Sequence, residues 1–193
     1  MERILTTLAM ASDSQPPGKP GKKNDQIDIE KQRTQSQALP DVEISEILGF
    51  LEVLKSKGGK ADIYHLAGEL NMEFGDTLNV VRAAELLGFV HTPGGDVVLE
   101  EVGIQVTKAK MNTKKSMIKD QIKAIPVFQS LLSFLQGMEN HEAEKDMILE
   151  KLAELLPNEN AEESFSKLVD WGRYAEIFGY NDDTEMFYLD SQN

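Results

Sequence analysis

The chain has 193 residues, no cysteine and a net charge of −13. The lack of cysteine excludes disulfides and thiolate chemistry, and the negative charge disfavours binding to nucleic-acid phosphates. Hydrophobic residues make up 40% of the sequence, enough for the core of one domain or of two very small ones. No run of eighteen apolar residues occurs and the first ten residues make a poor secretory signal, so we expect a cytoplasmic protein without a membrane span.

The N-terminal segment, residues 1–38, is predicted to be a flexible tether. From about residue 11 it is rich in Pro, Gly, Lys, Gln and Ser, and its few apolar residues cannot offset the entropy of ordering. Residues 1–40 hold six of the 20 basic and five of the 33 acidic residues, a net charge of +1. The remaining 14 basic and 28 acidic residues give the predicted folded part a net charge of −14.

A first folded unit is predicted over residues 39–111. Apolar residues between Ile44 and Leu54 recur at helical spacing, and Gly58 ends that helix. Asp62 is placed to cap a second helix and Asp76 a third.

A β-hairpin is predicted after the third helix, which we expect to end just before Gly88. The apolar stretches 89–91 and 97–99 flank a glycine-containing turn, Thr92-Pro-Gly-Gly-Asp96. Three short helices followed by a hairpin are typical of a winged helix, a variant of the helix-turn-helix.

A second unit is predicted over residues 112–193, because the end of the first unit recurs there. Ala84-Glu-Leu-Leu-Gly-Phe89 reappears as Ala175-Glu-Ile-Phe-Gly-Tyr180, 91 residues further on. At both places we expect a helix that ends at the glycine and an aromatic residue that opens a short strand.

Periodicity predicts the other elements of this second unit. One helix ends near Gly137, another runs from about Glu142 to Leu156, and a third from Glu162 to Phe178. A hairpin over residues 180–189 follows, with a polar turn. The predicted fold class is therefore mainly α with small β-hairpins, built as tandem winged-helix-like units joined by helices.

The sequence lacks the usual apparatus for nucleotide chemistry. The pairs Gly18-Lys19, Gly21-Lys22 and Gly59-Lys60 have neither the upstream glycine nor the following Ser or Thr of a Walker A loop. The run Val97–Glu101 resembles a strand that ends in magnesium-binding acids, but without that loop we interpret it as a wing strand. We expect no ATPase activity from this chain and no cofactor.

Other catalytic or metal-binding patterns are also missing from the sequence. His65, His91 and His141 have no partner at metal-ligand spacing, and no nucleophile elbow occurs. The many carboxylates are best interpreted as solvated helix faces, although an enzyme with a carboxylate pair stays an alternative. We predict no catalytic, cofactor-binding or metal-binding residues.

A basic stretch stands out from the acidic background. Six of the residues from 108 to 123 are lysines, and Asp120 is the only acid among them. Part of the set would form one stripe on a helix, able to meet an acidic partner, a membrane surface or nucleic acid. The alternative is that the stripe pairs with acidic faces of this same chain. The candidate partner contacts are Lys114, Lys115, Lys119 and Lys123.

Two further candidate contacts lie in the last predicted helix. Trp and Arg are enriched in interface hot spots, which makes Trp171 and Arg173 candidates. The alternative for Trp171 is a place in the core.

The charges of the predicted third helices argue against a DNA-binding role. Helix 76–87 has a single basic residue, Arg82, and helix 162–178 sets Lys167 and Arg173 against four acids. Neither hairpin carries Lys or Arg to reach phosphates. Protein-binding winged helices fit these faces better, with a winged-helix transcriptional regulator as the alternative.

Several stretches carry a resemblance to a known family. The closing run Asp170-Trp-Gly-Arg-Tyr-Ala-Glu-Ile-Phe-Gly-Tyr-Asn-Asp-Asp183, followed by Tyr188-Leu-Asp190, and the runs Leu39–Leu54, Gly58–Ala67 and Ala84–Phe89 resemble the AAA-associated C-terminal domain. That module is found fused behind the ATP-binding subunit of nitrate/sulfonate/bicarbonate-type ABC transporters, and also alone. The resemblance covers roughly residues 39–190.

The resemblance implies a role in regulating or assembling a transporter ATPase, and it supplies no catalytic residues to carry over. The protein partner would be an ABC-transporter ATPase subunit or its complex. The expected localisation is therefore the cytoplasm, including the periphery of the inner membrane when the transporter complex is bound. Met1–Leu8 is similar to the end of the ATPase domain in such fusions. We therefore expect a separately encoded module or the remnant of a split fusion.

Overall fold

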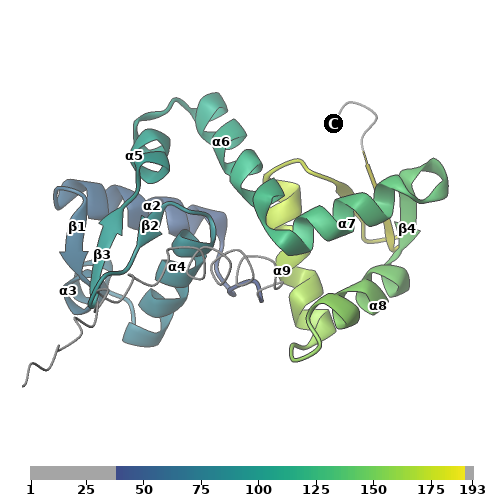
Figure 1. The fold of residues 1–193 in the computed structure, drawn as a ribbon, viewed down its shortest axis with the longest axis horizontal. Coiled ribbons are helices and arrows are strands. Elements are labelled where there is room, and N and C mark those ends of the chain that lie inside the picture. The colour runs from purple at the N-terminus through teal and green to yellow at the C-terminus, as the bar shows by residue number, and fades with distance from the viewer. Residues whose placement is uncertain (1–37, 190–193) are drawn as a thin grey trace, which may run out of the picture. The chain divides into compact units, whose positions relative to one another are not determined.

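The computed structural model describes residues 38–189 and shows a mainly helical protein with small antiparallel sheets (Figure 1). The predicted mainly α fold class is confirmed. All of the predicted tether except Ala38 lies outside the described residues.

The first unit consists of helices and short strands in the order α, β, α, α, β, β. Its three strands form one antiparallel sheet in the order β1-β3-β2, with Lys60 opposite Val98 and Val90 opposite Leu99. The elements are α2 (Ile44–Ser56), β1 (Lys60–Asp62), α3 (Ile63–Leu70), α4 (Phe74–Leu86), β2 (Val90–His91) and β3 (Asp96–Leu99).

Apart from an added 3-10 helix, the second unit repeats this order of elements and of strands. Its sheet runs β4-β6-β5, with Ala143 and Tyr180 both paired with Phe187. We interpret both units as winged-helix-like. The elements are α7 (Pro126–Gln136), the 3-10 helix η1 (Glu139–His141), β4 (Glu142–Glu144), α8 (Lys145–Leu155), α9 (Ala161–Tyr174), β5 (Gly179–Asn181) and β6 (Met186–Tyr188).

Two helices join the units, α5 (Glu101–Lys108) and α6 (Met111–Ala124), and α6 leads into α7 (Figure 1). Pro126 stands at the first turn of α7, where its missing N–H costs no hydrogen bond.

The first strand of each sheet was not predicted from sequence. Lys60–Asp62 and Glu142–Glu144 have no β-branched or aromatic residue, and each pairs with a strand more than thirty residues later. These edge strands form only because they pair with β3 and β6, so the β-propensity of their own residues does not predict them. The helix expected from Glu142 therefore begins only at Lys145.

The predicted helix starts were right at Asp62 and wrong at Asp76. The Asp62 carboxylate accepts hydrogen bonds from the backbone N–H groups of Tyr64 (2.9 Å) and His65 (3.2 Å) and so caps α3. Asp76 instead lies within the first turn of α4, whose N-cap is Glu73. An acid there still meets the positive end of the helix dipole, which is why the pattern suggested a cap.

The predicted end of the last helix was also wrong. The helix expected over residues 162–178 spans Ala161–Tyr174, and Glu176 takes a left-handed conformation with φ of 52°. Gly179 does not end a helix but lies in β5, where an added Cβ would sit 2.0 Å from the ring of Tyr188. This glycine is thus required by the packing of a ring across the hairpin.

One continuous hydrophobic core underlies both units. In the second unit it is dominated by aromatic rings around Phe187, whose centroid lies 4.7 Å from that of Tyr180, 5.1 Å from Phe178 and 5.5 Å from Phe165. Each such ring pair contributes about 0.5–1.5 kcal/mol beyond the area that it buries. In the first unit the largest fully buried side chains are Ile47, Phe50, Leu51, Leu54, Leu66, Leu87 and Phe89.

Gly103→Ala tests how closely α5 packs on the first hairpin. An added Cβ at Gly103 would lie 2.2 Å from the carbonyl oxygen of Phe89, a backbone atom that cannot move aside alone. We expect the free energy of unfolding to fall by about 1–3 kcal/mol in urea denaturation.

Gly49→Ala is the matched control, since Gly49 lies in α2 with no atom within 4 Å of its virtual Cβ. There the substitution should raise stability by about 0.5–1 kcal/mol through helix propensity. Equal effects of the two variants would contradict the close packing of α5.

Candidate protein-interaction surfaces

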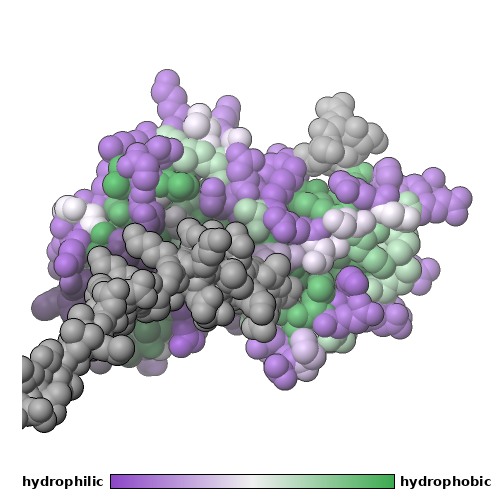
Figure 2. Space-filling model, in the orientation of Figure 1, coloured by the Kyte–Doolittle hydropathy of each residue, from purple (hydrophilic) through white to green (hydrophobic). Residues whose placement is uncertain are grey.

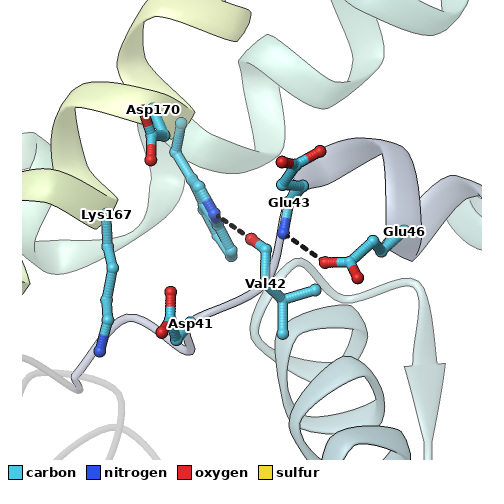
Figure 3. Close-up of a pocket in the computed structure, with 7 residues that line it drawn as sticks. Asp41, Val42, Glu43, Glu46, Lys167 and Asp170 are labelled. Atoms are coloured by element: carbon cyan, nitrogen blue, oxygen red, sulfur yellow. Dashed lines mark hydrogen bonds between the residues drawn. The ribbon is translucent and has the colours of Figure 1, made fainter. Parts of the chain in front are cut away.

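Trp171 is a core residue that connects the two units. Its side chain is 1% exposed, and its Nε1–H donates a hydrogen bond of 2.9 Å to the carbonyl oxygen of Val42 (Figure 3). The bond joins α9 to the segment that enters α2, 129 residues earlier in the chain. The indole is therefore not available to a partner.

A small polar crevice of about 190 Å³ lies beside this bond. One of its acids, Glu46, accepts a hydrogen bond of 2.9 Å from the backbone N–H of Glu43 and so fixes the start of α2 (Figure 3). Besides Val42 and Trp171, the crevice is lined by Asp41, Glu43, Glu46, Lys167 and Asp170.

The lysine stripe lies on α6, and the structure directs most of it toward this same chain. Lys115 donates a hydrogen bond to the carboxylate of Glu176, and Lys119 donates one of 3.0 Å to the Glu176 carbonyl oxygen. Lys114 forms an ion pair of 3.3 Å with Glu52 of α2. Lys123, on the same helix face, is half-buried. Figure 2 shows hydrophilic residues gathered along α6.

These contacts hold the end of α9. The hydrogen bond from Lys115, and then its charge, lower the pKa of the Glu176 carboxyl. Lys119 brings a cation to the C-terminal end of α9, where the helix dipole favours positive charge. Lys115 and Lys119 thus hold the connecting helix α6 against the end of α9 in the second unit.

Arg173 is likewise engaged within the second unit. Its guanidinium donates hydrogen bonds of 2.6 Å to the Tyr180 carbonyl oxygen and to a carboxylate oxygen of Asp182. Its Cζ lies 5.5 Å from the centre of the Tyr180 ring. Arg173 therefore fastens α9 to the β5–β6 hairpin.

The sequence did not single out a stacked aromatic pair on α3 and α4. Tyr64 is 70% exposed and Phe74 37%, and their rings lie parallel within 7° with centroids 4.5 Å apart. Both residues lie in the first turn of their helices, and Asn71, in a left-handed conformation, turns the chain between them. The one available indication was that Tyr64 falls outside the apolar face of its helix.

Two kinds of site are not found in the part of the chain that the structure describes. Residues 38–189 contain no group of three His, Asp or Glu side chains placed to hold a metal ion. No helix in the same range is long and apolar enough to cross a membrane.

Residues 64–181, from α3 to β5, match the family described as the C-terminal AAA-associated domain. The chain belongs to this family. No curated protein and no solved structure was found to match it. The AAA-associated domain is an accessory domain rather than a catalytic one, and membership supports association with an ATPase of the ABC type.

The two hairpins of this AAA-associated domain carry acids and no Lys or Arg. The β2–β3 hairpin carries Asp96 and the β5–β6 hairpin carries Asp182, Asp183 and Glu185, and neither hairpin has Lys or Arg. The only basic residue of α4 is Arg82. These are the positions from which a winged helix would contact phosphates, and the hairpins offer no Lys or Arg for that contact. Asp96 forms an ion pair with Lys60, and Asp182 forms one with Arg173.

Trp171→Phe and Trp171→Ala test the connection between the units. Phe keeps most of the volume but leaves the Val42 carbonyl without its donor, so stability should fall by about 1–3 kcal/mol. Ala also leaves a cavity and should cost about 3–5 kcal/mol. Urea denaturation measures both.

Tyr174→Phe serves as the control for these variants, because it changes a half-buried aromatic on the same helix and should alter stability by less than about 0.5 kcal/mol. A Trp171→Phe variant as stable as the unmodified protein would contradict a contribution from the bond to Val42.

The pKa of Glu176 tests the fastening by Lys115. The carboxyl should titrate below its ordinary value of 4.5 in an NMR pH titration, and Lys115→Ala should move its pKa back toward that value. Because the folded-state pKa is lowered, the contribution to stability is present above the unfolded-state pKa and is lost as the pH falls through the folded-state value.

Lys123→Ala is the matched control, since Lys123 belongs to the same stripe but does not contribute to the lowering at Glu176. A Glu176 pKa that stays low in Lys115→Ala would show that another group stabilises the carboxylate.

Proposed function

We propose that this chain is a non-catalytic regulatory or assembly module that binds a protein, and that the protein is an ABC-transporter ATPase subunit of the nitrate/sulfonate/bicarbonate type. The observation that carries the proposal is the match of residues 64–181 to the C-terminal AAA-associated domain. The resemblance of the closing run Asp170–Asp183 to the domain behind such ATPases supports the choice of transporter class.

The charge distribution supports a protein over DNA as the partner. Without its first 40 residues the chain carries a net charge of −14, and the hairpins contain Asp and Glu but no Lys or Arg. Neutralising phosphates with basic side chains supplies most of the non-specific affinity for DNA, and such side chains are scarce here. A surface of this kind suits a partner that offers positive groups.

The domain organisation that we propose follows the repeat. Residues 1–38 act as a tether, residues 39–111 form the first winged-helix-like unit, and residues 112–193 form a helical linker with the second. The place of action would be cytoplasmic, at the inner membrane when the transporter complex is assembled. ATP hydrolysis would belong to the partner, so that regulation appears as a change in the partner's rate.

The part of the lysine stripe that we keep as a candidate contact is Lys123. Lys114, Lys115 and Lys119 already bond to groups of this chain, and a partner could use them only by displacing those bonds. Exchanging one exposed ion pair for another gains little free energy.

The direct test is binding to the purified ATPase subunit of a nitrate/sulfonate/bicarbonate-type transporter from the same genome. We expect a complex with a Kd of about 10 μM or tighter in isothermal titration calorimetry, and a change in the ATPase rate of the subunit when the chain is added.

A parallel titration with duplex DNA over a salt series distinguishes the alternative. No complex with the ATPase subunit, together with DNA binding that weakens steeply as salt rises, would overturn the proposal in favour of a winged-helix transcriptional regulator.

A further inference from the structure

We infer that the stacked pair Tyr64 and Phe74, with the acids beside it on α3 and α4, is a docking site for an arginine-bearing segment of a partner protein. The inference deepens the proposed function and rests on its claim that the partner is a protein. It does not depend on which protein that is.

The aromatic pair forms a preorganised platform. Tyr64 is the second most exposed of the large hydrophobic residues in the described range and Phe74 is also exposed, yet the two rings already stack flat on one another. An aromatic side chain has few torsions, and a stacked one has lost most of that freedom before a partner arrives. Binding to such a platform therefore costs little conformational entropy.

The stretch of sequence that carries the pair is acidic. Between Lys60 and Arg82 the chain contains no Lys or Arg but four acids. Asp62 caps α3, and Glu69 forms an ion pair of 2.7 Å with Lys57. The four acids are Asp62, Glu69, Glu73 and Asp76.

Two of these acids are available to a partner. Glu73 and Asp76 are exposed on either side of Phe74 in the sequence, and within residues 38–189 no ion pair engages either carboxylate. Glu73 is the N-cap of α4, and Asp76 lies in the same first turn of the helix as Phe74.

The combination of ring faces and carboxylates selects a guanidinium. Arginine stacks on aromatic faces and also forms paired hydrogen bonds with carboxylates, whereas lysine offers only a compact charge. An apolar partner would bury Glu73 and Asp76 without counter-ions, which is costly. A nucleic acid would bring phosphates to the same acids and be repelled.

The place of the pair in the fold supports the same inference. In helix-turn-helix proteins the start of the recognition helix meets the ligand, and α4 is the corresponding third helix of the first unit. Here that start presents Phe74 between acids, with Tyr64 stacked on it from α3 (Figure 1 shows the two helices packed together). The start of α4 thus corresponds to the place where such proteins contact their ligand, and its side chains suit a protein rather than DNA.

The experiment has a peptide arm and a partner arm, both with the full chain. In the first, an arginine-rich peptide and its citrulline counterpart, which has the same shape without the charge, are titrated into the ¹⁵N-labelled protein. We expect the arginine peptide to shift amide signals over residues 62–78 and the citrulline peptide to leave them in place. Equal shifts with both peptides, or shifts elsewhere alone, would overturn the inference.

In the second arm the affinity for the purified ATPase subunit is compared among variants. Tyr64→Ala and Phe74→Ala should weaken binding about 3- to 30-fold, as should the charge reversal Asp76→Lys. Tyr64→Phe keeps the ring and should bind like the unmodified chain. Met147→Ala, at an exposed hydrophobic residue on α8, is the matched control and should have no effect.

The outcomes separate the two proposals. If the unmodified chain does not bind the ATPase subunit, the proposed function fails, and the peptide arm alone decides the docking site. If the subunit binds and the Tyr64, Phe74 and Asp76 variants bind equally well, the docking site is wrong while the proposed function stands. Self-association that is lost in Tyr64→Ala would assign the surface to a second copy and so contradict the inference.

Discussion

The hydrogen bond from the Trp171 indole to the Val42 carbonyl is the contact on which the rest of the fold depends. It is buried, and it connects the entry of the first unit with the last helix of the second. A buried polar bond of this kind is costly to break because each partner would lose water without replacement. One hydrophobic core runs through both units, and Trp171, which the sequence offered as a candidate contact, is part of it.

This arrangement determines where charge is left for function. Lys114, Lys115 and Lys119 of α6 and Arg173 of α9 bond within the chain, to Glu52, Glu176 and the β5–β6 hairpin. Exposed acidic side chains remain at the start of α4 and in the β5–β6 hairpin, although Asp182 pairs with Arg173. The elements follow the order found in a winged helix, but the hairpins have no Lys or Arg and α4 has only Arg82, so the basic side chains of a DNA-binding protein are missing there. Recognition of a positively charged protein surface is what this distribution suits.

Local patterns predicted the parts of this structure that local forces determine. The periodicity between Ile44 and Leu54 and the cap at Asp62 were read correctly because helix burial and capping act within a few residues. The strands at Lys60–Asp62 and Glu142–Glu144 were missed because their partners lie far along the chain. The stacking of Tyr64 on Phe74 was missed for a different reason: the two residues are close in sequence, but their contact depends on the angle between two helices. The lysine stripe was placed correctly on a helix, but its partners could not be predicted without the fold.

Hydrogen–deuterium exchange of the full chain, alone and with the purified ATPase subunit, tests the central claim most directly. A protein-binding module that docks through α3 and the start of α4 should exchange more slowly over residues 62–78 in the complex, with the β2–β3 and β5–β6 hairpins unchanged. Exchange that is unaffected by the ATPase subunit but is slowed in α4 and the hairpins by duplex DNA would contradict the account.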